Sequence, residues 1–215
     1  MEETVYERVR SSNNNHWWFK SRVLIFETII KDLITKKKIE ILDYGCGIGS
    51  NINMLRKYGT VDVCETHLKT REYIKKKFNA SIVKKIKKNY DLIFLTDVIE
   101  HIKNDKEKIK KLIKHLKKNG LLFITVPAYQ SLFSSKDVTL HHYRRYNKYS
   151  LKKIFPHKEI KIIKLSYFNF FLFPPIVLII IFFKIFKIKF IDRVEKAPIP
   201  LILLCSKFFL LKDFY

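Results

Sequence analysis

Apolar runs of strand length alternate with amphipathic stretches along most of this 215-residue chain. Strands are predicted at 39–43, 61–65, 90–98 and 121–127, with a weaker candidate at 80–85. Helices are predicted at 20–35, 50–58, 69–78 and 105–118, the last of them ended by Asn119 and Gly120. Each clear strand is apolar throughout rather than at alternate positions, which is typical of parallel strands covered on both faces. The sequence therefore predicts an α/β fold with a doubly wound, mostly parallel sheet.

Shifts in composition divide the chain into three regions. Residues 1–38 form an N-terminal arm and helix, and residues 39–166 form the sheet with its helices. Residues 167–215 form an apolar and basic C-terminal appendage, for which we expect helical structure.

The composition of the C-terminal appendage suggests contact with a membrane. Its apolar stretch at 167–183 is shorter than the roughly twenty residues of a spanning helix, and Pro174 and Pro175 interrupt it. Lysines alternate with apolar residues directly after it, a mixture that favours a segment lying among lipid head groups. A buried helix that completes the core and an oligomer interface are the alternatives.

Charge and cysteine content limit the possible partners and metals. The formal net charge of +23 favours anionic partners such as acidic lipids or nucleic acid, although a codon bias toward Lys, Ile, Asn and Phe would have the same effect. Cys46, Cys64 and Cys205 show no metal-ligand spacing, so we expect neither a disulfide framework nor a metal site. The polar N-terminus does not read as a signal peptide, and we expect a cytoplasmic protein, with peripheral membrane contact as an extension of that expectation.

The stretch "ILDYGCGIGS" carries the most specific chemistry. Gly45, Gly47 and Gly49 follow a strand two residues apart, which is not the spacing of a dinucleotide-binding loop. Asp43 at the strand end would repel a pyrophosphate but would suit an ammonium or sulfonium group. Glu65, at the end of the second strand, stands where an acid can accept hydrogen bonds from both ribose hydroxyls. Together these residues fit S-adenosyl-L-methionine better than a nicotinamide nucleotide.

This pattern resembles the class I S-adenosylmethionine-dependent methyltransferases. "ILDYGCGIGS" is similar to their first motif, and "DLIFLTDVIEHIKND" followed by "LKKNGLLFITVPAY" is similar to their fourth and fifth strands. "HWWF", "LFSSKDVTLHHYRRYNKYSL" and "LSYFNFFLFP" resemble a narrower subgroup that carries all three features. The resemblance implies a Rossmann-like methyltransferase fold, S-adenosyl-L-methionine as the cofactor, and an N-terminal arm that covers the cofactor cleft.

The resemblance and the residue types together predict the site. The cofactor-binding residues are predicted to be Asp43, Gly45, Cys46, Gly47, Glu65, Asp97 and Val98. The catalytic candidates are His101, His141 and His142, because histidine can act as a base near neutral pH. The substrate-binding candidates are Arg144, Arg145, Tyr146 and Trp18. The alternatives are a tight turn and capping acids for the first group, a polar or solvated basic loop for the histidines and arginines, and a hydrophobic anchor for the tryptophan.

Two departures from the family stand out. "NASIVKKIKKNYD" lacks the acid that often contacts the adenine amine in relatives, so how adenine is held is open. Relatives continue past the apolar tail into a last antiparallel strand, whereas this chain stops at "KDFY". The sequence leaves open whether the sheet lacks that strand or the sequence ends early.

Three classes of function fit these features. The first is methyl transfer to a small-molecule, lipid or lipid-linked acceptor, driven mainly by positioning, with a general base needed only for an acceptor that still carries its proton. The second is RNA methylation, which the charge suggests. It is disfavoured because "TDVI" stands where base-amine methyltransferases carry an Asn/Asp-Pro-Pro-aromatic motif. The third is a non-catalytic scaffold that binds the cofactor or a membrane.

Overall fold

The computed structural model describes residues 17–36, 38–156, 159–168, 174, 177–178, 181–182, 185–186 and 206–213, with the backbone alone at 17, 18 and 206–213. The strands are β1 (Ile39–Tyr44), β2 (Gly59–Cys64), β3 (Ser81–Ile82), β4 (Tyr90–Thr96), β5 (Leu116–Pro127), β6 (Ile160–Tyr167) and β7 (Ser206–Asp213). The helices and helical turns are α2 (Trp17–Lys31), α3 (Ile52–Leu55), α4 (Leu68–Phe78), η1 (Ile99–His101), α5 (Asp105–Ile113), η2 (Gln130–Leu132), α6 (Ser135–Thr139) and α7 (Lys148–Lys152).

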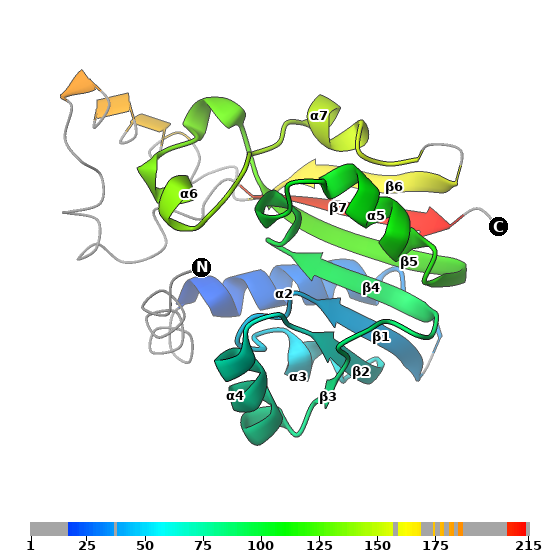
Figure 1. Cartoon of the computed structure of the whole chain (residues 1–215). Coiled ribbons are helices and arrows are strands. Elements are labelled where there is room, and N and C mark those ends of the chain that lie inside the picture. The colour runs from blue at the N-terminus through cyan, green and yellow to red at the C-terminus, as the bar shows by residue number, and fades with distance from the viewer. Residues whose placement is uncertain are drawn as a thin grey trace.

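All seven strands join one sheet in the order β3-β2-β1-β4-β5-β7-β6 (Figure 1). The first five pair in parallel, and β7 is antiparallel to both of its neighbours, β5 and β6. The predicted α/β architecture with a mostly parallel sheet is confirmed.

Apolar cores cover both faces of the sheet. On one face, Phe26 of α2 packs edge-to-face against Phe94 of β4 and Phe123 of β5. On the other face, Leu95 belongs to a buried cluster that includes Ile109 of α5. Phe94 and Leu95 are neighbours that serve opposite cores because successive strand residues point to opposite faces. This explains the continuous apolar runs of the sequence and confirms the doubly wound arrangement.

Several boundaries differ from the prediction. Helix α5 ends at Ile113 instead of residue 118, because Leu116 already pairs with Tyr90 as the first residue of β5. The pairing then shifts, so that Leu92 faces Leu121. Asn119 has the left-handed backbone expected of it (φ 63°), but it lies in this irregular start of the strand rather than at a helix end. Leu116 fits a helical apolar stripe and a buried strand equally well, which is why the pattern misplaced the boundary.

The last antiparallel strand, which the sequence left open, is present. Strand β7 lies between β5 and β6 and pairs with each of them along nearly its whole length (Figure 1). Its eight residues fall in the range 167–215 that we assigned to a helical appendage, so this part of the chain belongs to the sheet. The run "SKFFLLKD" was misread because it continues the apolar composition of the segments before it.

The topology determines where a ligand can bind. Strand β1 has β2 on one side and β4 on the other, so the order of strands along the chain reverses between β1 and β4. The carboxyl ends of β1, β2, β4 and β5 meet at one edge of the sheet, and ligands of open α/β sheets bind outside such a reversal point. No helix in the part of the chain that the structure describes is long and apolar enough to cross a bilayer.

Candidate functional site

The loop after β1 approaches the loop after β4 closely. The backbone N–H of Gly45 donates to the carbonyl of Cys64, with 2.7 Å between nitrogen and oxygen. Gly45 has a φ of +71°, and a Cβ atom on it would lie 2.6 Å from Cγ2 of Val98. Both the backbone conformation and the lack of space therefore disfavour a side chain at this position. Gly47 also has a left-handed φ, of +52°, but a Cβ on it would meet no described atom within 4 Å. Space therefore remains beside Gly47 for a ligand.

Asp43 is a buried carboxyl group near the end of β1. Its side chain is 0% exposed, and neither oxygen has a hydrogen-bond partner among the described residues. Burial, and then the nearby charge of Glu65, raises the pKa of Asp43 to about 8. A buried polar group without a hydrogen bond is costly, so a cationic ligand at this position would supply the interaction that is missing.

Glu65, in contrast, accepts hydrogen bonds from three backbone N–H groups. Its Oε2 accepts a hydrogen bond from the N–H of Gly47 at 3.0 Å, and its Oε1 accepts from Thr66 at 2.7 Å and His67 at 2.9 Å. The carboxylate thus joins the glycine loop to the loop after β2. This places it next to the open space at Gly47, where the sequence predicted a ribose contact.

The carboxylate of Asp97, after β4, is engaged within the protein. Its Oδ1 accepts a hydrogen bond from the Thr125 hydroxyl at 3.0 Å, and its Oδ2 lies 2.6 Å from the guanidinium of Arg22 on α2. Asp97 has a φ of 56°, so the chain turns sharply at this residue. Its predicted contact with the cofactor stays a prediction, whereas Val98 contacts Gly45 as part of the loop wall.

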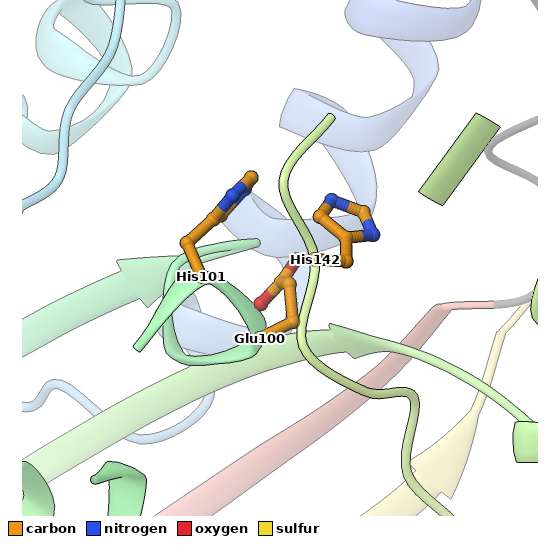
Figure 2. Close-up of side chains that lie close together, drawn as sticks. All are labelled: Glu100, His101 and His142. Atoms are coloured by element: carbon orange, nitrogen blue, oxygen red, sulfur yellow. The ribbon is translucent and has the colours of Figure 1, made fainter. Parts of the chain in front are cut away.

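Three polar side chains gather beyond the carboxyl end of β4. Figure 2 shows Glu100 and His101 on η1 and His142 on the segment that passes beside it. One ligand atom from each of the three lies within 4.8 Å of those of the other two, and the two imidazole rings meet edge-to-face with centroids 4.5 Å apart. The N–H of Tyr143 donates to the carbonyl of Glu100 at 2.8 Å, which fixes the two segments together.

The environments of Glu100 and His101 are unusual. Glu100 is 0% exposed, and neither carboxylate oxygen meets a hydrogen-bond partner in another described residue. Burial, and then Asp97, raises the pKa of Glu100 well above its usual range. Burial and the adjacent His142 lower the pKa of His101 to about 4. Both shifts favour the uncharged forms of these side chains in the ligand-free protein.

Asp137 orients His142. Its Oδ1 lies 2.9 Å from Nδ1 of His142, and Arg145 donates to both oxygens of the same carboxylate at 2.8 Å. The backbone N–H of Ser134 adds a hydrogen bond to Oδ2 at 2.9 Å. Although burial opposes ionisation, the hydrogen bonds from His142 and Arg145 hold the pKa of Asp137 below its ordinary value. Because Nδ1 of His142 is occupied, Nε2 is the nitrogen that remains for a ligand.

The basic loop is a network of internal ion pairs. Arg144 lies 2.6 Å from Oδ2 of Asp105 and donates to the carbonyl of Lys103 at 2.8 Å. The buried hydroxyl of Tyr146 donates to the same Asp105 oxygen at 2.8 Å. With Arg145 held by Asp137, all three predicted substrate-binding residues of this loop have protein partners. Their contact with a substrate stays a prediction.

The other predicted residues are placed as follows. Cys46 is buried in the glycine loop, where burial raises the pKa of its thiol above the usual range. His141 is exposed, with a left-handed backbone of φ 57°. The backbone of Trp18 belongs to α2, but its side chain and the segment before Trp17 lie outside the described residues, as does the predicted lid.

Sequence reasoning missed two carboxylates, Glu100 and Asp137. Glu100 lies directly before His101 in "DVIEHI", so an acid next to a candidate histidine was the available signal. Asp137 lies in "SSKD", where an acid three residues after a serine is typical of a capping box, and the structure shows one with Ser134. Its second role, as the partner of His142 and Arg145, depends on the path of the loop and has no local signal.

Comparisons with known proteins identify relatives of this chain. The curated relatives include a ubiquinone biosynthesis O-methyltransferase of Rickettsia canadensis (strain McKiel). The alignment is 30% identical over 113 residues, and it covers 47% of this chain and 48% of the relative. The chain thus spans about half the length of the curated relatives it matches. Among solved structures, the N-methyltransferase NodS from Bradyrhizobium japonicum WM9, in complex with S-adenosyl-L-homocysteine, superposes with a TM-score of 0.63 at 8% identity over 98% of both chains.

A second solved structure shows the same fold. The S-adenosylmethionine-dependent methyltransferase from Clostridium acetobutylicum ATCC 824 superposes with a TM-score of 0.60 at 15% identity, over 97% of this chain and 96% of the other. At such low identity these likenesses establish the fold. The family described as "Methyltransferase domain" matches residues 20–161, which is more than half of the sequence. The chain therefore belongs to the methyltransferase domain family.

Proposed function

We propose that the protein transfers a methyl group from S-adenosyl-L-methionine to an oxygen atom of a small-molecule acceptor. The observation that carries the proposal is the buried, unpartnered carboxyl group of Asp43 beside the open space at Gly47. Family membership supports methyl transfer as the type of reaction. S-adenosyl-L-methionine would supply a methyl group already activated on a sulfonium.

The residues at the ends of β1 and β2 fit this cofactor. Asp43 would lose its proton and face a cationic group, which removes the cost of its burial. Gly47 leaves room for the cofactor to approach the backbone. Glu65, held by three backbone N–H groups, would offer its remaining lone pairs to ribose hydroxyls. In an in-line displacement, such residues act by positioning the reactants and excluding water.

The acceptor side favours a hydroxyl group. Glu100, His101 and His142 lie together beyond β4, next to the loop wall that Val98 forms with Gly45. A hydroxyl group needs help to lose its proton at neutral pH, whereas a free amine is already nucleophilic, and a cluster of ionisable groups suits the first case. The relatives named ubiquinone biosynthesis O-methyltransferase support oxygen as the methylated atom.

A lipid-linked acceptor at a membrane surface is the more specific version of this proposal. Leu178, Ile181, Phe182, Ile185 and Phe186 are all at least 45% exposed. Exposed apolar side chains at helical spacing favour contact with a lipid surface, and the net charge of +23 favours anionic head groups. Sedimentation with anionic vesicles, compared with neutral vesicles, tests this part. Failure to bind either would remove the lipid surface and leave a soluble acceptor.

Calorimetric titration with S-adenosyl-L-methionine tests the cofactor, and release of S-adenosyl-L-homocysteine with a panel of phenols, lipid extracts and RNA tests the acceptor. We expect saturable binding by the wild type and a loss of at least about 100-fold in affinity for Asp43→Asn, because a cation would face an amide instead of a carboxylate. Asp91→Asn is the matched control, since Asp91 lies at the opposite end of β4 and pairs with Lys117. A folded wild type that binds no cofactor would overturn the proposal, and turnover with RNA alone would replace the acceptor.

A further inference from the structure

The cluster of Glu100, His101 and His142 has the composition of a metal site. Two imidazoles and one carboxylate each offer a ligand atom, and these atoms lie within 4.8 Å of one another. Ligands of one Zn²⁺-like ion, bound at about 2.0–2.2 Å, lie roughly 3–3.5 Å apart. Rotations of the three side chains that move each ligand atom by about 1 Å would therefore close the cluster around an ion.

The unpartnered carboxyl of Glu100 is an independent sign that something is bound here. It is fully buried, yet neither of its oxygens meets a hydrogen-bond partner in another described residue. Groups of this kind are rare unless an ion, a water or a catalytic role accounts for them. A cation between the two imidazoles would give the carboxylate its partner.

His142 also has the support that metal-binding histidines have. Such a histidine typically donates its second ring nitrogen to a carboxylate or a carbonyl, which fixes the ring and its tautomer. Nδ1 of His142 lies 2.9 Å from Oδ1 of Asp137, and Arg145 donates a hydrogen bond to each oxygen of this carboxylate. The contact with Asp137 thus holds the His142 ring in place and leaves Nε2 as the nitrogen that can bind a metal ion.

We propose that Glu100, His101 and His142 bind a divalent transition-metal ion, such as Mn²⁺, Fe²⁺ or Zn²⁺, through Glu100 and the two imidazoles. A mixed nitrogen and oxygen ligand set suits these ions better than Mg²⁺ or Ca²⁺, which prefer oxygen alone. Three protein ligands leave coordination positions open, as in metal sites that act on a substrate. The proposal departs from the expectation of no metal site, which rested on the cysteine spacing alone.

The ion deepens the proposed function, on which this part of the inference rests. A bound metal lowers the pKa of a coordinated hydroxyl, so the acceptor would lose its proton to solvent at neutral pH. The acceptor oxygen would then use its electron pair to form the new O–CH₃ bond, while the pair of the broken S–CH₃ bond stays on sulfur. Glu100, His101 and His142 would thereby select an acceptor with a hydroxyl group that can reach the ion.

Titration with MnCl₂ alone, followed by electron paramagnetic resonance of the free ion, tests the site without cofactor or acceptor. We expect one Mn²⁺ per chain, displaced by ZnCl₂ but not by equal MgCl₂. Glu100→Gln, His101→Gln and His142→Gln should each weaken binding at least about tenfold, and Asp137→Asn by about 10–100-fold, as for other residues that orient a ligand. The charge of +23 disfavours binding of cations elsewhere on the surface.

Two controls make the result specific. His115→Gln removes a histidine from the turn before β5, at the amino end of β4, and should leave Mn²⁺ binding unchanged. Circular dichroism melting of each variant identifies those that fail to fold. If one of the three ligand variants does not fold, Mn²⁺ binding by the other two tests the site. A folded wild type without saturable Mn²⁺ or Zn²⁺ binding would overturn the inference, as would ligand variants that bind like the wild type.

The two proposals can fail separately. Asp43→Asn should lose S-adenosyl-L-methionine and keep Mn²⁺, because Asp43 is no part of the cluster. Binding of Mn²⁺ by a wild type that does not bind the cofactor would overturn the proposed function and leave the metal site standing. Cofactor binding and turnover that persist in metal-free protein would overturn the metal's role in the reaction.

Discussion

Two regions of the molecule each hold two buried carboxyl groups in different environments. The first region lies at the ends of β1 and β2, and the second lies in the segments that follow β4 and β5. The first region contains Glu65, which accepts three backbone hydrogen bonds, and Asp43, which has no hydrogen-bond partner among the described residues. The second region contains Asp137, which is held by His142 and Arg145, and Glu100, which has no hydrogen-bond partner in another described residue. In each region, the satisfied carboxylate orders the loops and the unpartnered one marks the place where a cation would bind. The difference lies in the neighbours: glycine backbone suits an organic cation, and imidazole suits a metal ion.

The largest effect should follow from breaking the satisfied carboxylate of the second region. Asp137→Ala would leave Arg145 and His142 without their partner at a site where the carboxylate is 1% exposed. We expect the free energy of unfolding to fall by about 3–5 kcal/mol, as for other buried pairs that lose one member. Urea denaturation measures this, and Glu107→Ala, in an exposed pair with Lys111, should not change it. A loss as small as that of the control would mean that Asp137 does not order the loop.

The sequence predicted the first region better than the second. Asp43, Gly45, Gly47 and Glu65 lie in two short segments at strand ends, so strand patterns and local spacing were sufficient to bring them together. In the second region, Glu100 on η1 is far in sequence from Asp137, which lies on α6, and from His142, which lies in the segment after α6. Their contacts depend on how that loop folds back, which apolar periodicity does not encode.

The fold, too, was predicted correctly where local sequence patterns determine it and incorrectly where pairing between distant segments does. Alternation of apolar and amphipathic segments predicted the parallel part of the sheet, because its central strands β1, β4 and β5 are largely buried on both faces. Strand β7 was missed because its place between β5 and β6 is set by pairing with both strands. The boundary at Leu116 was missed because one buried leucine fits two periodicities.

The two glycines of the first region should differ when a methyl group is added. Gly45→Ala must place its Cβ against Val98 and hold a φ of +71°, so we expect a loss of about 3 kcal/mol in the free energy of unfolding from strain and overpacking. Gly47→Ala meets open space and should lose only about 1 kcal/mol, from its φ of +52°. Thermal denaturation measures both. If Gly47→Ala keeps full affinity for S-adenosyl-L-methionine, the open space is not the cofactor site.

The pH dependence of cofactor affinity tests the role of Asp43. Its pKa of about 8 means that cofactor binding at neutral pH must release a proton. Affinity should therefore rise with pH, by up to about tenfold per unit, and level off above about pH 8. In the ligand-free protein, the stability that protonated Asp43 contributes is fully present below its ordinary pKa of 3.8 and is lost as the pH rises through about 8.

Calorimetry in buffers of different ionisation enthalpy measures the released proton directly. Asp43→Asn should remove both the proton release and the pH dependence of stability between pH 3.8 and about pH 8 that comes from this group. Binding by the wild type with no proton exchange at pH 7 would show that Asp43 stays protonated, and the cation would then have to be bound elsewhere.

The smallest effect is expected for a methionine substitution at Glu100, and the same substitution at Glu65 separates the two kinds of carboxylate. Glu100→Met replaces a buried, unpartnered carboxyl with an apolar side chain of similar size, so in metal-free protein the free energy of unfolding should rise by about 1 kcal/mol. Glu65→Met should lower it instead, because it strands three backbone N–H groups. Added Mn²⁺ should stabilise the wild type and not Glu100→Met, since an ion that binds only the folded state raises its stability. Equal losses in both variants would break the comparison, because Glu100 would then be a structural carboxylate like Glu65 rather than a vacant cation ligand.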